Sequence, residues 1–280
     1  MFSMSYRSMS YRFFPLWRTG LFLLCLGVAL LVSAIISAEE PNTGSDQNPV
    51  VLRSDFADQD ALADAADAVD GSSALTEKLR RLDPTCPIWI TPDRGEVLLL
   101  GTICLKEGLL EFFACGKNSK EHESIVSLEV KPYIICAALM VIGARKGTPV
   151  KFSPEFTPPT GEEIEILVRW REGGELRQRR AQELVRRTDT GQEMTYPWVF
   201  TGGMLSKDAK GRPFYMADMT GEVIGVSNFP ASVLDVPVQS SADNDALEFE
   251  PFTEHIPEVG TVVTLVLRRA ARESQEEGEK

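Results

Sequence analysis

The sequence predicts an α+β fold: a strand-dominated, antiparallel single domain with one buried apolar helix at about residues 132–142. Short apolar segments separated by Gly, Pro and Asp recur along the body of the chain, which favours antiparallel sheet. Residues 163–180 alternate apolar and polar side chains before Gly173-Gly174, a pattern typical of a hairpin. Residues 132–142 are apolar nearly all round, begin with Pro132 and are followed by Gly143, which predicts a helix buried against a sheet.

The remaining elements follow from shorter patterns of the same kind. The return arm of the hairpin, residues 176–180, is basic, and its Arg side chains are expected to face Glu163 and Glu165 across the strands. A short helix is expected at 74–82. Further strands are expected at 96–104 (buried), 109–114, 124–130, 197–202, 214–217, 222–226, 247–249 and 261–267.

The N-terminus has the pattern of an export signal. Residues 21–36 form an apolar run that follows Arg7, Arg12 and Arg18. The run has 16 residues, which is long for a signal peptide and short for a membrane-spanning helix. Cleavage near Ala38 and retention as a single anchor therefore both stay open, and either outcome places the body outside the cytoplasm.

Charge and composition divide the rest of the chain. The protein has 29 Lys and Arg against 41 Asp and Glu, and this acidic balance argues against binding of nucleic acid. Residues 39–72 hold nine acidic side chains and one basic one, too polar to fold alone. We therefore expect four parts: a signal peptide or anchor at 1–38, an acidic and mostly disordered tether at 39–82, one domain at 83–270 and a polar tail at 271–280.

Motifs in the body bear a family resemblance. In order, they are the segments 111–126, 137–139, 143–144, 158–161, 198–203, 215–218, 227–231, 234–237, 240–241 and 256–257. This order resembles the YdjY-domain family of exported bacterial proteins, over roughly residues 85–268. The resemblance implies export and a YdjY-like domain, and it implies no established activity. Some relatives carry ferredoxin-type Cys clusters, but this sequence has no Cys-x-x-Cys, so an iron–sulfur role is not transferred.

The cysteines are disulfide candidates if the body is exported. Cys86, Cys104, Cys115 and Cys136 lie outside the N-terminal run and permit three pairings, with buried free thiols as the alternative. They include no closely spaced ligand pair, and two His cannot build an all-His site, so we expect no metal and no cofactor.

The strongest catalytic candidates lie in one polar segment. His122, Glu123 and Ser124 follow Lys117, and an extended backbone would place His122 and Ser124 on one face. A His can act as a base near neutral pH when a carboxylate orients it. The alternative is a hydrogen-bonded His at a strand edge. Nucleophile-elbow, zinc-protease and phosphate-loop motifs are missing from the sequence.

A second group of residues has the composition of a binding site. Trp198, Tyr215, Asp218 and Asn228 combine aromatic rings with amide and carboxylate groups, which suits a sugar or a peptide; Lys117 is a further ligand-binding candidate. At strand spacing, Trp198 could equally belong to the core.

The functional expectation is an exported cell-envelope domain, most simply a non-enzymatic module for binding or assembly. Its partners would be the membrane, through an uncleaved N-terminal segment, and an envelope protein or glycan. The alternatives are an envelope hydrolase or transferase that uses His122 with a nearby carboxylate, and a thiol redox protein. The expected location is periplasmic, or extracytoplasmic and membrane-anchored.

Overall fold

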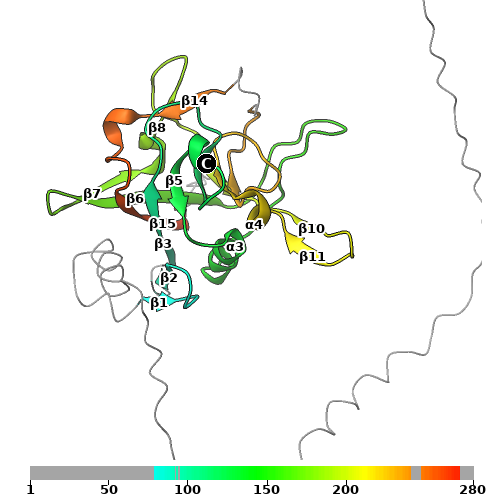
Figure 1. The fold of residues 1–280 in the computed structure, drawn as a ribbon. Coiled ribbons are helices and arrows are strands. Elements are labelled where there is room, and N and C mark those ends of the chain that lie inside the picture. The colour runs from blue at the N-terminus through cyan, green and yellow to red at the C-terminus, as the bar shows by residue number, and fades with distance from the viewer. Residues whose placement is uncertain (1–78, 92, 94, 241–246, 272–280) are drawn as a thin grey trace, which may run out of the picture. The chain divides into compact units, whose positions relative to one another are not determined.

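The computed structural model describes residues 79–91, 93, 95–240 and 247–271 (Figure 1). The predicted signal or anchor, nearly all of the predicted tether and most of the polar tail lie outside these residues. The helix predicted at 74–82 is wrong in its described part, where Arg80–Arg81 form strand β1 against β2 (Ile88–Thr91).

Eight strands close into a barrel. In order around the ring they are β3, β15, β6, β9, β13, β12, β4 and β5, and β5 pairs with β3 to close it. Their bounds are β3 Glu96–Ile103, β4 Phe112–Gly116, β5 Ser124–Leu128, β6 Glu163–Glu172, β9 Trp198–Phe200, β12 Glu222–Gly225, β13 Leu234–Asp235 and β15 Val262–Arg269.

This closed barrel corrects the predicted fold class. The protein is not an antiparallel α+β domain built around a buried helix, because the sheet itself closes around the core. The pairing is also mixed: β4–β5 and β12–β13 are parallel. Side-chain alternation identifies strands, but it carries no information about which distant strands pair. For this reason the segments could be found in the sequence while the closure could not.

Two short α-helices accompany the barrel in the described part of the chain: α3 (Pro132–Val141) and α4 (Ala217–Thr220). Only one face of α3 is buried, with Ile134, Ile135, Ala138 and Leu139 in the core. The opposite face is open to solvent, so the prediction of a buried apolar helix is wrong. A helix on the outside of a barrel can reach the core with one side only. Within the described residues, no helix has both the length and the apolar character needed to cross a bilayer.

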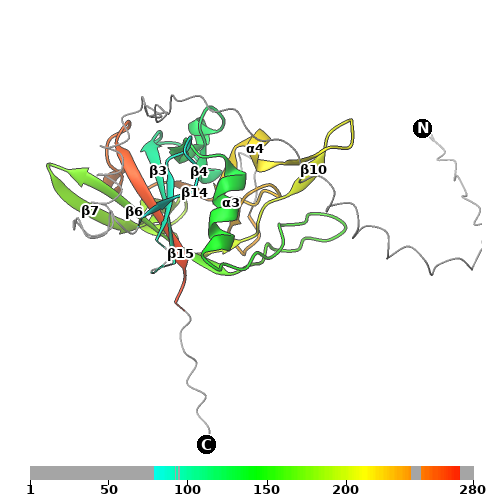
Figure 2. The ribbon, with the colours of Figure 1, turned by 90° about the horizontal axis from the view of Figure 1, so that it is seen from below.

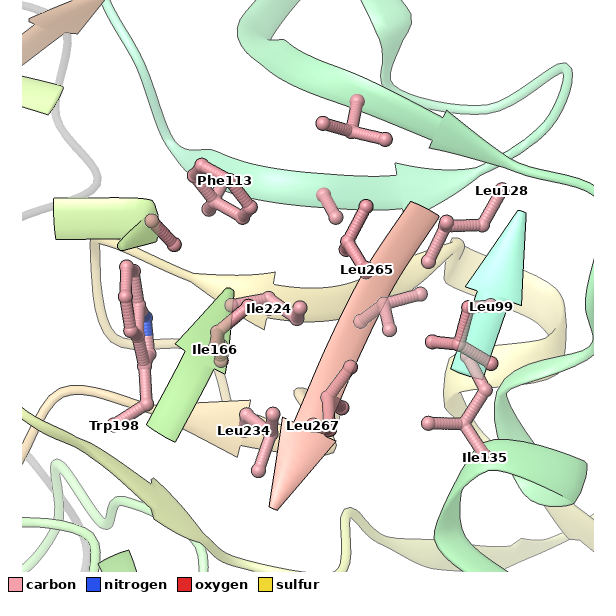
Figure 3. Close-up of a cluster of buried hydrophobic side chains, with 14 of the residues drawn as sticks. Leu99, Phe113, Leu128, Ile135, Ile166, Trp198, Ile224, Leu234, Leu265 and Leu267 are labelled. Atoms are coloured by element: carbon pink, nitrogen blue, oxygen red, sulfur yellow. The ribbon is translucent and has the colours of Figure 1, made fainter. Parts of the chain in front are cut away.

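The core fills the interior of the barrel. Figure 3 shows side chains from strands all around the ring converging on one volume, including Phe113, Ile166, Ile224 and Leu265. All four are fully buried. Large apolar side chains that meet in this way supply most of the free energy that favours folding.

Strand β3 is buried on both faces, as the sequence predicts. Val97 and Leu99 point into the barrel core, whereas Leu98 and Leu100 join a second cluster with Trp89 on the outer side. A strand covered on both sides needs apolar residues at consecutive positions, which explains the unbroken run in the sequence.

The predicted hairpin is confirmed as β6 and β7 (Glu175–Arg180), with Gly173 and Gly174 both at positive φ in the turn. The predicted pairing of the β7 Arg side chains with Glu163 and Glu165 is wrong, because Arg177 lies opposite Trp170. Glu165 instead accepts a 2.6 Å hydrogen bond from Nε of Arg268 on the neighbouring strand β15.

The remaining elements lie off the ring. Strands are found in or beside most of the predicted segments, with boundaries shifted by a few residues. The elements not yet given are η1 Glu121–Glu123, η2 Ala181–Leu184, β8 Val185–Arg187, β10 Leu205–Lys207, β11 Pro213–Tyr215, β14 Phe249–Pro251 and η4 Thr253–His255.

Candidate functional site

A cleft of about 440 Å³ lies beside the N-terminal end of α3. Its walls come from three segments that are far apart in sequence: the turn after β4, the connection from β5 to α3, and helix α4. Figure 2 shows α3 and α4 side by side, and the two helices are in contact. The cleft brings together Lys117 and Asp218, two of the binding candidates from the sequence.

Local sequence explains why α3 begins here. Pro132 occupies the first turn, where its missing N–H costs nothing. The Oδ1 atom of Asp218 accepts a 3.0 Å hydrogen bond from the backbone N–H of Tyr133. A carboxylate at a helix N-terminus satisfies a free donor and complements the helix dipole. Asp218 therefore joins α4 to the start of α3 and forms part of the cleft wall.

The turn after β4 is held by one carboxylate. Glu121 accepts hydrogen bonds from the backbone N–H groups of Asn118 and Ser119 and, at 3.3 Å, from the hydroxyl of Ser127. Burial opposes ionisation of Glu121, but these donors outweigh it and lower its pKa. Asn118 adopts a left-handed backbone with φ of 60°, which Asn tolerates better than most residues. The turn is thus fixed in one shape.

The cleft carries both signs of charge. Lys117 forms an ion pair with Glu129, and both side chains are more than half exposed. Burial raises the pKa of Asp218, while its bond from Tyr133 and the charge of Lys131 act in the opposite direction. Such a wall can bind a small polar group through Lys117, Lys131 and Asp218. It holds no His or Cys among its lining residues.

The catalytic candidates lie elsewhere. The assumption of an extended backbone is wrong, because residues 121–123 form the short helix η1. The His122 side chain is 76% exposed, and its Nε2 lies 3.6 Å from the Glu123 carboxylate. Ser124 is fully buried, and its hydroxyl has no hydrogen-bond partner of normal geometry. His122 and Ser124 therefore do not share an accessible face.

Glu123 is already engaged by Lys120. The Lys120 ammonium lies 2.8 Å from Glu123 and 3.3 Å from Glu111, over the rings of Phe112 and Phe229 at 4.9 and 5.2 Å. Burial raises the pKa of Glu111, and the hydrogen bond with Glu123 raises it further. Glu111 was not among the candidates from the sequence, where its only signal is its place at the start of the segment 111–126.

The aromatic candidates do not form a site together. Trp198 is fully buried, and its Nε1 donates a 2.7 Å hydrogen bond to the carbonyl of Gly225. Trp198 therefore belongs to the core, which was the alternative to a binding role. The hydroxyl of Tyr215 donates to the carbonyl of Gly202 at 3.0 Å. Asn228 is buried, and its side chain bonds to Asp235 and to the backbone of Val236 and Ser240. These contacts hold the fold together.

Asp235 is a carboxyl group in the interior of the barrel domain, with a strongly raised pKa. It is fully buried; one oxygen accepts bonds from Asn228 and the N–H of Val236, and the other has no partner. Burial raises its pKa to about 8, and those two bonds only partly offset the increase. The sequence showed Asp235 within a motif of the family resemblance, but gave no sign of its burial.

All four cysteines described are free thiols. Cys104 donates a 3.1 Å hydrogen bond to the carbonyl of Ser124. Its interaction with the thiol of Cys115 raises its own pKa and lowers that of Cys115 to about 7. Cys115 is fully buried, whereas Cys104 is partly exposed. In the part of the chain that the structure describes, no three His, Cys, Asp or Glu side chains are grouped as metal ligands.

Comparison with known proteins places the chain in a family. The family model of the YdjY domain matches residues 88–268. The chain belongs to the YdjY-domain family. The match runs from strand β2 to strand β15, so the barrel and the cleft beside α3 both lie within the YdjY domain. Searches of curated proteins and of solved structures gave no match.

Proposed function

We propose that the protein is an exported cell-envelope domain that binds a polar ligand or partner in the cleft beside α3 and catalyses no reaction. The observation that carries the proposal is the cleft itself, where Lys117, Lys131 and Asp218 converge from three segments on a fixed frame. The one hydroxyl side chain of its lining, Ser119, donates to the carbonyl of Gly116, and a wall of mixed charge suits recognition better than bond cleavage. The N-terminal apolar run behind three Arg supports export.

Binding is tested by capture of envelope components with the full chain. We expect Lys117→Ala with Lys131→Ala to lose most of the wild-type partners, while His122→Ala, outside the cleft, keeps them. Circular dichroism establishes that each variant is folded. If the cleft variant keeps the same partners, or His122→Ala loses them, the binding site is not this cleft.

Export is tested separately. Cell fractionation should recover the body outside the cytoplasm, and a C-terminal reporter should be accessible to protease in intact spheroplasts. A protected reporter would contradict the envelope location without affecting the binding result.

A thiol redox protein is a second candidate function, favoured by the mutual effect of Cys104 and Cys115. The hydrogen bond with Cys104 lowers the pKa of Cys115, which favours the thiolate, and the thiolate is the reactive form. If the protein is a redox protein, the rate of Cys115 alkylation by iodoacetamide should rise between pH 6 and 8. In Cys104→Ser this rise should occur at higher pH. Alkylation of Cys115 that appears only when the protein is unfolded would exclude a thiol redox function.

A further inference from the structure

The outer face of α3 is apolar, although it faces solvent. Tyr133, Ala137, Met140 and Val141 lie along one side of the helix at spacings of four, three and one residues, and all are exposed. The exposed fractions of Tyr133, Met140 and Val141 are 46%, 47% and 63%. A surface helix normally carries polar residues on this side, because its apolar face is already used against the core. Here both faces of α3 are apolar.

The apolar face extends onto α4. Met219 is 75% exposed and follows Asp218, whose carboxylate bonds to the N–H of Tyr133. We define the docking face as Tyr133, Ala137, Met140, Val141 and Met219. Met and Tyr are well suited to such a surface: a Met side chain adapts its shape, and Tyr combines an apolar ring with a polar hydroxyl.

Cations flank α3 in the sequence, and the acidic side chain bonded to the helix start is Asp218 of α4. From Lys131 to Lys146 the sequence contains Lys131, Arg145 and Lys146 and no acidic residue, in a chain of net charge -12. All three cations are exposed, and Arg145 is paired with Glu162. The Lys146 stem packs against Gly202, since a Cβ placed on that glycine would lie 2.9 Å from Lys146 Cδ. Exposed apolar side chains with cations near them suit contact with an anionic lipid surface, where the apolar groups enter the interface and the cations reach the headgroups.

We propose that the docking face binds an anionic lipid surface, with α3 lying parallel to the membrane plane. The helix has ten residues and is about 15 Å long, which suits interfacial contact and not insertion across a bilayer. The proposal rests on the proposed export and takes the N-terminal run as a retained anchor, because a tethered body meets the lipid at high effective concentration. Lys131 and Met219 also line the cleft, so lipid contact is read at Met140, which does not line it.

The test uses the full chain reconstituted into vesicles of phosphatidylcholine with phosphatidylglycerol. A photo-crosslinking side chain replaces Met140. A matched control replaces Leu176, which is 42% exposed and belongs to β7, a strand that lies apart from α3 in Figure 1 and Figure 2. We expect lipid adducts at position 140 and few at position 176. Vesicles of phosphatidylcholine alone should give much weaker labelling at position 140.

The cations are tested in the same assay. Lys131→Gln with Lys146→Gln should reduce the lipid adduct about tenfold or more, since each cation near an anionic surface contributes roughly fivefold. Arg177→Gln on β7 should leave the adduct unchanged. Adducts between two chains, or equal labelling at positions 140 and 176, would overturn the lipid assignment.

The experiment distinguishes failure of the membrane segment from failure of the docking face. Full chain that floats with the vesicles but gives no lipid adduct at position 140 refutes the docking face alone. Full chain that does not float refutes both the membrane segment and the docking face, and leaves binding in the cleft as a separate question.

Discussion

Gly221 ends α4 in the left-handed region, with φ of 78°. It also packs against the turn after β4, and a Cβ added there would overlap the Ser119 side chain. We expect Gly221→Ala to destabilise the protein by about 2–4 kcal/mol, from backbone strain and overpacking together. Gly211 has nearly the same φ, 77°, but open space around it, so Gly211→Ala should cost only about 1 kcal/mol. Urea unfolding measures both; equal losses would show that Ser119 exerts no steric effect.

Asp235 should make stability depend on pH. Because burial raises its pKa from 3.8 to about 8, the native state keeps a proton that the unfolded chain releases. The contribution of this group to stability is therefore complete below about pH 4 and is lost as pH rises towards 8. Asp235→Asn keeps an oxygen for the bonds from Asn228 and Val236 but cannot ionise.

Unfolding in urea at several pH values provides the measurement. Relative to wild type, Asp235→Asn should gain up to about 1 kcal/mol per pH unit between pH 5 and pH 8. Asp189→Asn is the control without a slope in this range, because Arg187 lowers the pKa of exposed Asp189 and its carboxyl is ionised in both the folded and the unfolded chain above pH 5. A difference between Asp235→Asn and wild type that does not change with pH would contradict the raised pKa.

Individual residues also mark the limit of prediction from this sequence. The motif at 234–237 pointed to Asp235, but burial of its carboxyl depends on strands from distant parts of the chain. Lys117 and Asp218 were candidates for separate reasons, and only folding shows that both line one cleft. His122 was a candidate because an imidazole can act as a base, but residue type alone does not tell whether a side chain lies in a pocket.

Among the elements, β15 illustrates how local patterns succeed and fail. Its apolar run at 261–267 predicted a strand, and the strand is confirmed as Val262–Arg269. Its neighbours β3 and β6 begin about 166 and 99 residues earlier, so no local pattern could identify them. The same separation in sequence explains why the predicted charge pairing within the hairpin is wrong. The partner of Glu165 comes from β15 and not from β7.

The central position of β15 makes it a test of core packing. Leu265 is fully buried between β3 and β6, so Leu265→Ala should cost about 2–5 kcal/mol, the usual range for a large core side chain. Val262 lies on the same strand but is 52% exposed, and Val262→Ala should change stability by about 0.5 kcal/mol or less. Similar losses for the two variants in thermal unfolding would show that Leu265 is not in a packed core.

At the scale of the whole molecule, closure of the barrel depends on a glycine. Gly101 lies opposite Leu128 where β3 meets β5, and a Cβ there would come within 2.6 Å of Val126 Cγ1 and 2.9 Å of Leu128 Cδ2. Any larger side chain must push the two strands apart at the pair that closes the ring. We expect Gly101→Ala to cost about 1–3 kcal/mol.

A double-mutant cycle separates this clash from a general loss of stability. Val126→Ala removes the methyl group nearest to the added Cβ, but it also leaves a cavity in the core. If the two strands are held apart by this contact, the double variant should lose at least about 0.5 kcal/mol less than the sum of the single variants. Additive losses would mean that Gly101 is needed for another reason. A favourable coupling energy would show that glycine at position 101 is needed for barrel closure, because Val126 and Gly101 contact each other only when β5 completes the barrel.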